Sequence, residues 1–206
     1  MDILYTLNYL NDFLKIHMNV SFINQLWFVL FSVVLIFVYV REQQYIFIYY
    51  TIWTFILETI FFALLVFKKE HIAKKIYPMV YSPAIVVCVG FWVIIAPSTK
   101  SRAITNLVFT IVTHGLNAFA LILQPYKIHM AELWKPVVWT AIYNIFLAIY
   151  VGSGGRSISG ALPYWYAQYD NALGWVFAAL AISAVTIVHI FSSTKQKNKI
   201  EQVEIV

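Results

Sequence analysis

Six apolar runs separated by short polar segments dominate the chain. They cover residues 23–40, 45–67, 76–96, 103–123, 137–151 and 172–191. A transmembrane helix needs about 20 apolar residues to cross the ~30 Å hydrocarbon core of a bilayer. The pattern therefore predicts an all-α, polytopic membrane protein built as a six-transmembrane-helix bundle. The fifth run is short and carries Tyr143 and Asn144, so it is the weakest candidate span.

The two ends of the chain differ from these runs. Ile3, Leu7, Leu10 and Leu14 fall at helical spacing among polar residues, a pattern typical of an amphipathic helix lying in the membrane interface. We therefore expect an interfacial helix over residues 1–20 and a polar tail over residues 192–206.

Composition points to the same class of protein. Of 206 residues, 62% are hydrophobic and 11% are charged, more apolar surface than a soluble protein of this size could cover. The short connections predict a single integral membrane domain over residues 1–206. The net charge of +5 comes mostly from lysines near predicted helix ends. Such lysines indicate contact with lipid headgroups, and no nucleic-acid partner is expected.

Positive charge is unequally divided between the two sides of the predicted bundle. One side would carry the connections after the second and fourth spans together with both termini, and it collects ten cations: Lys15, Lys68, Lys69, Lys74, Lys75, Lys127, Lys135, Lys195, Lys197 and Lys199. The other side holds four: Arg41, Lys100, Arg102 and Arg156. Cytoplasmic loops are enriched in lysine and arginine, so both termini are predicted on the cytosolic or equivalent side. The endoplasmic reticulum or plasma membrane is favoured, with the mitochondrial inner membrane as an alternative.

Polar residues inside the spans are the best candidates for a functional site, because polar groups in hydrocarbon are costly. On the second span, Thr51, Thr54 and Glu58 share one helical face. The fourth span carries a second stripe: Asn106, Thr110, Thr113, His114 and Asn117. At ~1.5 Å per residue, Glu58 lies about 20 Å and His114 about 17 Å below the start of their helices, with Thr51 at about 9 Å. The two stripes could therefore form a buried polar pocket, with Thr54, Asn117 and Thr110 among its lining residues.

The residue types suggest a chemistry for this pocket. A threonine hydroxyl becomes a nucleophile when a base takes its proton, and histidine is the usual base. Glu58 could orient His114, as the third member of a triad does. The structural alternative is that these side chains make interhelical hydrogen bonds, as Thr and Asn often do in membranes.

Short motifs in the same segments resemble a known family. In Tyr50-Thr51-Ile52-Trp53, the threonine precedes the pair Phe61-Phe62 by ten residues. Thr113-His114-Gly115-Leu116-Asn117 resembles an Asn-His-Gly-x-His motif, and Phe91-Trp92-Val93-Ile94 resembles a third-helix end. Together they resemble the androgen-induced-gene and androgen-dependent TFPI-regulating protein family over residues 45–191. Gly154-Gly155 and Tyr169-Asp170-Asn171 look closer to the related rolling-stone proteins.

The resemblance implies a six-helix membrane hydrolase acting on fatty acid esters of hydroxy fatty acids. Thr51 would be its nucleophile and His114 its base, with no cofactor or metal. Three positions depart from the family pattern: Thr54 stands where an acidic residue is expected, Glu58 where a glutamine is, and Asn117 where a second histidine is. The rolling-stone branch is associated with membrane roles in muscle-cell fusion.

The sequence is compatible with three hypotheses about function. The first is the lipid-ester hydrolase, whose partners are membrane lipids and the ester. The second is a non-catalytic accessory subunit of a larger membrane complex, with membrane-protein partners. The third, a transporter or channel, is weakened because the sequence has no internal repeats or paired broken helices. The long connection 152–171, rich in Gly, Ser and aromatic residues, is either an interfacial loop or a lid over the site.

Overall fold

The computed structural model describes residues 20–95, 110–157, 160–164 and 167–204. The predicted interfacial helix over residues 1–20 lies almost wholly outside these ranges. In the described residues every regular element is helical. The elements are α2 (Val20–Glu42), η1 (Gln43–Ile48), α3 (Tyr50–Val66), α4 (Glu70–Gly90), η2 (Phe91–Ile95), η4 (Val112–Leu116), α6 (Asn117–Ile122), η5 (Met130–Glu132), α7 (Trp134–Gly152) and α8 (Ala172–Glu204).

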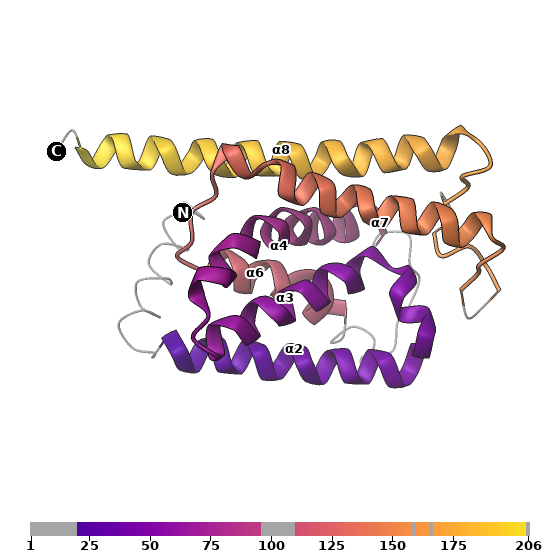
Figure 1. The fold of residues 1–206 in the computed structure, drawn as a ribbon, viewed down its shortest axis with the longest axis horizontal. Helices are drawn as coiled ribbons and strands as arrows, with labels where there is room; N and C mark the ends of the chain where they lie inside the picture. Colours follow the sequence, from indigo (N-terminus) through magenta and orange to yellow (C-terminus); the bar gives the residue numbers. More distant parts are fainter. Residues whose placement is uncertain (1–19, 96–109, 158–159, 165–166, 205–206) are drawn as a thin grey trace.

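The helices alternate in direction along the chain (Figure 1). Helices α2, α4 and α7 run one way, and α3, α6 and α8 run the other way. As a result, α2 begins and α8 ends at the same end of the molecule, where the connections before α4 and before α7 also lie. The segment η1 and the connection after α7 lie at the opposite end.

Within the described residues, four helices are long and apolar enough to cross a membrane: Ser21–Val40, Glu70–Val93, Met130–Gly152 and Ala172–Thr194. The second and fourth predicted spans correspond to shorter apolar helices, Tyr50–Val66 and Val112–Ile122. The 17 residues of α3 rise about 26 Å, close to the minimum for a span. The fifth run is stronger than its apolar core suggested, because the helix extends back through Trp134 to the turn at Met130.

Large apolar side chains point outward from α2, α7 and α8. On α2 they recur at helical spacing and are more than half exposed, as at Phe22, Val29, Val33 and Ile36. Soluble monomers seldom expose continuous apolar stripes of this length. A lipid-facing surface accounts for this stripe, in agreement with the apolar helices.

Aromatic side chains fill the interface between α2, α3 and α4. Phe31 contacts Phe55 with ring centroids 4.7 Å apart and Phe62 at 5.5 Å, and all three rings are fully buried. Phe61 continues the cluster to Tyr77 of α4 at 5.5 Å. Because lipid tails are as apolar as these rings, close packing rather than water exclusion holds the helices together here.

Two helix boundaries differ from those the apolar runs predict. The run 45–67 is divided at Tyr49, whose backbone is extended (φ −105°, ψ 126°), so α3 starts only at Tyr50. The indole of Trp53 donates to the carbonyl of Phe47 at 2.6 Å and closes this break. At the other end of the chain, α8 continues to Glu204, so most of the predicted polar tail is helical.

Candidate functional site

One face of α3 carries polar side chains into the protein interior. Thr54 and Glu58 are both fully buried, and Thr51, one turn before Thr54, is half-buried. They share this face because residues three and seven apart in a helix project in similar directions. The protein interior beside α3 thus contains a carboxyl group and a hydroxyl group at mid-helix.

The second polar stripe meets the first at Glu58. Asn117, the first residue of α6, donates from Nδ2 to Oε1 of Glu58 at 3.3 Å, and both side chains are fully buried. The Asn117 side-chain oxygen accepts from the backbone N–H of Ala118 at 2.7 Å, which fixes the orientation of the amide. Thr110 and Thr113, on the turns just before, are also buried. The structure therefore joins two predicted site residues, Glu58 and Asn117, that lie 59 positions apart in sequence.

Two π-helical turns shape the surroundings of His114. The segments Phe91–Ile95 and Val112–Leu116 are both π-helices, a widened turn that often occurs at functional sites. The imidazole of His114 stacks on the ring of Phe91, with centroids 3.9 Å apart and planes at 9°. The indole N–H of Trp92 donates to the His114 carbonyl at 3.0 Å. These contacts hold the imidazole against the end of α4.

Two oxygen atoms near the hydrogen bond between Asn117 and Glu58 are buried without a hydrogen-bond partner in the described part of the chain. They are Oγ1 of Thr54 and Oε2 of Glu58. These residues are one helical turn apart, so both atoms belong to the same polar patch. An unsatisfied buried polar group costs about 1–3 kcal/mol, which a polar group of a bound molecule would offset. The patch therefore has unused hydrogen-bonding capacity next to the Asn117 amide.

The expected approach of Thr51 to His114 stays a prediction. If Glu58 and Asn117 lie at the same depth in the bundle, Thr51 precedes that depth by seven residues on α3. His114 precedes it by three residues on the neighbouring helix. At ~1.5 Å per residue the offset along the helices is about 6 Å, somewhat less than the ~8 Å difference from the depth estimate. The observed partner of Glu58 is Asn117, and the orientation of His114 by Glu58 also stays a prediction.

The connection after α7 packs against the start of α3. The Tyr164 hydroxyl accepts from the Tyr50 backbone N–H at 3.0 Å, and its ring meets Tyr49 edge-on with centroids 5.8 Å apart. Ala167 in the same connection is fully buried. Burial raises the pKa of Tyr164 to about 12, so this hydroxyl keeps its proton. Part of the connection therefore packs beside Tyr50, the residue before Thr51, and the lid and interfacial-loop interpretations both stay predictions.

Further hydrogen bonds connect α7 with the start of α3, with η1 and with the connection. The hydroxyls of Tyr50 and Thr140 share a hydrogen bond of 2.6 Å, and the Tyr143 hydroxyl donates to the carbonyl of Ile48 at 2.8 Å. Asn144 donates to the Thr140 carbonyl at 2.8 Å, and Tyr169 reaches Asn144 at 3.4 Å. The polar residues that made the fifth run look weak are thus used for contacts between α7, α3 and the connection.

Comparison with known proteins adds no assignment to this site. Neither the protein-family models nor the curated proteins nor the solved structures contain a match to this chain.

Proposed function

We propose that this chain is a six-span intramembrane hydrolase of lipid esters. The observation that carries the proposal is the buried patch of Thr54, Glu58 and Asn117, with two oxygen atoms unpartnered in the described residues. Such a patch in apolar surroundings suits a ligand that is mostly hydrocarbon with one polar centre, and a fatty ester has that composition. The family resemblance supplies the reaction class, a threonine hydrolase of fatty acid esters of hydroxy fatty acids.

The proposed reaction uses two residues outside the Glu58–Asn117 contact. Thr51 attacks the ester carbonyl carbon through Oγ1 while the imidazole of His114 takes its proton. The imidazolium then returns the proton to the departing alkoxide, leaving an acyl-threonine and a free hydroxy fatty acid. Water, deprotonated by His114, then attacks the carbonyl carbon of the acyl-threonine. The bond from this carbon to the threonine oxygen breaks, the imidazolium returns its proton to that oxygen, and the fatty acid leaves.

The buried patch would bind the polar centre of the substrate. The Asn117 amide and the Thr54 hydroxyl can donate hydrogen bonds to the ester oxygens, and Glu58 can hold the Asn117 amide in position. The acyl chains would lie among the apolar helices and reach the site from the surrounding bilayer. Thr110 belongs to the same lining in this proposal.

The proposed topology places both termini on the cytosolic or equivalent side, with the connection 152–171 on the other. Cysteine-reactive labelling of intact membrane vesicles, with single cysteines placed at Lys68 and Ser153, should modify these positions from opposite sides. Labelling of both from one side would contradict the six-span arrangement.

Activity is tested with paired variants in purified, lipid-reconstituted protein. Thr51→Ala and His114→Ala should each lower hydrolysis of a branched fatty ester by 100-fold or more, the usual range for losing an activated nucleophile or its base. Thr59→Ala is the matched threonine control, because Thr59 lies on the same helix and its hydroxyl donates to the Phe55 carbonyl. His71→Ala, at an exposed histidine, is the matched histidine control. Equal activity in test and control variants would remove the proposal.

A second candidate function is a non-catalytic subunit of a membrane complex. The hydrogen bond from Asn117 to Glu58 favours it, because such bonds commonly join transmembrane helices. In that case the chain would co-purify with other membrane proteins in a fixed ratio in mild detergent, and the variants above would not change any esterase activity.

A further inference from the structure

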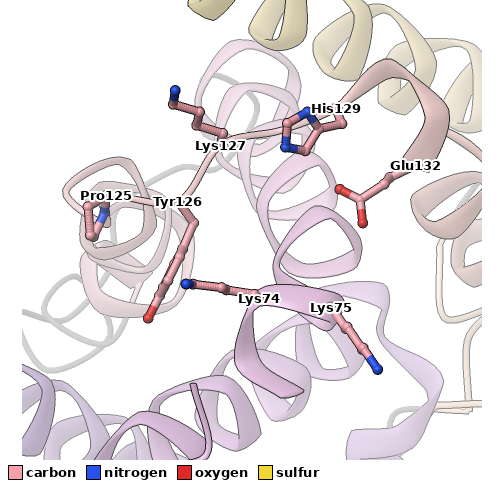
Figure 2. Close-up of a pocket in the computed structure, with 7 residues that line it drawn as sticks. All are labelled: Lys74, Lys75, Pro125, Tyr126, Lys127, His129 and Glu132. Atoms are coloured by element: carbon pink, nitrogen blue, oxygen red, sulfur yellow. The ribbon is translucent and has the colours of Figure 1, made fainter. Parts of the chain in front are cut away.

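A basic pocket lies at the end of the molecule where α4 begins. It has a volume of about 410 Å³ and is lined by Lys74, Lys75, Pro125, Tyr126, Lys127, His129 and Glu132 (Figure 2). These residues come from the start of α4, the connection after α6 and the short helix η5. A volume of roughly 300–1,000 Å³ is typical of small-ligand sites.

Positive charge dominates the lining of this pocket. The lining contains three lysines and one carboxylate, Glu132, and that carboxylate is paired with Lys135. The charges of Lys74, Lys75 and Lys127 are therefore in excess over the acidic charge of the lining. All three lysines are exposed, so packing of the fold does not require them. The pocket consequently favours an anion.

The walls of the pocket are tied together by contacts between distant segments. Lys135 donates to the Lys75 carbonyl at 2.9 Å as well as pairing with Glu132, which links α7 and η5 to α4. His189 of α8 contacts the His129 carbonyl through Nε2 at 3.0 Å. These links give the pocket a fixed frame, whereas lysines on an open helix end would have none.

Tyr126 provides a neutral hydrogen-bond donor beside the lysines. Figure 2 shows the Lys74 ammonium group directed toward the Tyr126 ring, and its nitrogen is 5.9 Å from the ring centroid. Burial raises the pKa of Tyr126, and the Glu70 carboxylate adds a smaller increase. The hydroxyl therefore remains a donor at neutral pH. Ammonium groups and a phenol together are suited to the oxygen atoms of phosphate.

The position of the pocket agrees with such a ligand. It lies where the candidate spans Glu70–Val93 and Met130–Gly152 begin, the level at which the phosphates of a bilayer occur. We propose that this pocket binds a phosphate-bearing anion, held by Lys74 and Tyr126, with Lys127 adding positive charge at its rim. The phosphate could belong to a lipid headgroup or to a soluble molecule, and this site is separate from the patch around Glu58.

The test uses the full chain in mild detergent and follows thermal unfolding by tryptophan fluorescence. Dioctanoyl phosphatidic acid, inorganic phosphate and dioctanoyl phosphatidylcholine are titrated at constant ionic strength. We expect a saturable rise in Tm with phosphatidic acid and none with phosphatidylcholine. A similar rise with inorganic phosphate would identify a soluble phosphate as sufficient, and a rise with the lipid alone would identify a headgroup. Either result supports the site, provided that the variants below respond as expected.

Paired variants separate the pocket from the general basic surface. Lys74→Gln with Lys127→Gln should weaken binding by roughly 30-fold, since each lysine near an anionic surface contributes about a factor of five. Tyr126→Phe, which keeps the ring contacts with Phe61 and Tyr77, should weaken it less. Lys68→Gln with Lys69→Gln changes the same charge outside the pocket and should alter binding less than threefold. No saturable shift with either phosphate probe, or equal losses in the two double variants, would overturn the proposal.

Discussion

Replacing Asn117 by leucine tests the contact that joins the two polar stripes. The substitution removes the Nδ2 donor to Glu58, leaving both carboxyl oxygens buried without a partner among the described residues. It also removes the acceptor for the Ala118 backbone N–H. A stranded buried polar group costs about 1–3 kcal/mol, and an average hydrogen bond between membrane helices about 0.6 kcal/mol. We therefore expect Asn117→Leu to lower the free energy of unfolding by about 2 kcal/mol.

Changes at Glu58 distinguish this reasoning from a simple effect of size. Glu58→Gln keeps an oxygen that accepts from Asn117 and should change the free energy of unfolding by less than about 0.5 kcal/mol. The double variant, with leucine at both positions, removes both partners and should recover much of the stability lost in Asn117→Leu, because an apolar pair leaves no group stranded. The double-mutant cycle should give a coupling of about 1–2 kcal/mol.

The assay is reversible unfolding of the purified protein in mixed micelles with rising SDS fraction, followed by helical circular dichroism. Glu58→Gln serves as the isosteric control. Additive effects of the two leucine substitutions, or a fully stable Asn117→Leu variant, would refute the claim that this hydrogen bond connects α3 to α6.

Two further predictions concern the connection after α7. Gly155→Ala should destabilise the protein by about 1–3 kcal/mol, because the added Cβ would lie 2.5 Å from the Tyr150 carbonyl oxygen. In Gly152→Ala the added Cβ meets nothing within 4 Å, so this variant should be neutral or stabilising. Thermal unfolding of both variants checks this, and equal Tm values would contradict it. Tyr164→Phe should loosen the connection after α7, because it removes the hydrogen bond to the Tyr50 N–H. Limited proteolysis should cleave the connection several times faster in this variant than in the control Tyr39→Phe, which changes an exposed tyrosine on α2. Identical cleavage rates would contradict the role of Tyr164.

The apolar pattern predicted most of the helices. Each described helix from α2 to α8 falls within or across one of the six apolar runs, because burial in lipid or protein requires long continuous hydrophobic segments. The break at Tyr49 was not predictable from the apolar run; the Tyr50 N–H beside it donates to Tyr164, which lies 114 residues further along the chain. The π-turn at His114 was also missed, because it goes with the stacking on Phe91 and the bond from Trp92, which periodicity does not encode.

The candidate site was predicted in part. Helical spacing placed Thr54 and Glu58 on one face, and rise per residue put Glu58 at a depth similar to that of His114 in the second stripe, so that the two stripes could meet. The rotation and register of one helix against another depend on tertiary packing, so the hydrogen bond between Asn117 and Glu58 could not be predicted from the sequence, and the orientation of His114 by Glu58 stays a prediction. The hydrogen bonds of Tyr50, Thr140 and Tyr143 were not predicted, because they join side chains and carbonyls of different helices, which periodicity along one helix does not encode.

The position of a covalent adduct tests the hydrolase proposal most directly. The reconstituted protein is treated with a fluorophosphonate that carries a long acyl chain, and the modified residue is located by peptide mass spectrometry. The account predicts an adduct on Thr51 that is lost in His114→Ala and retained in His71→Ala. A modified residue other than Thr51, or no adduct on protein that remains folded, would contradict it.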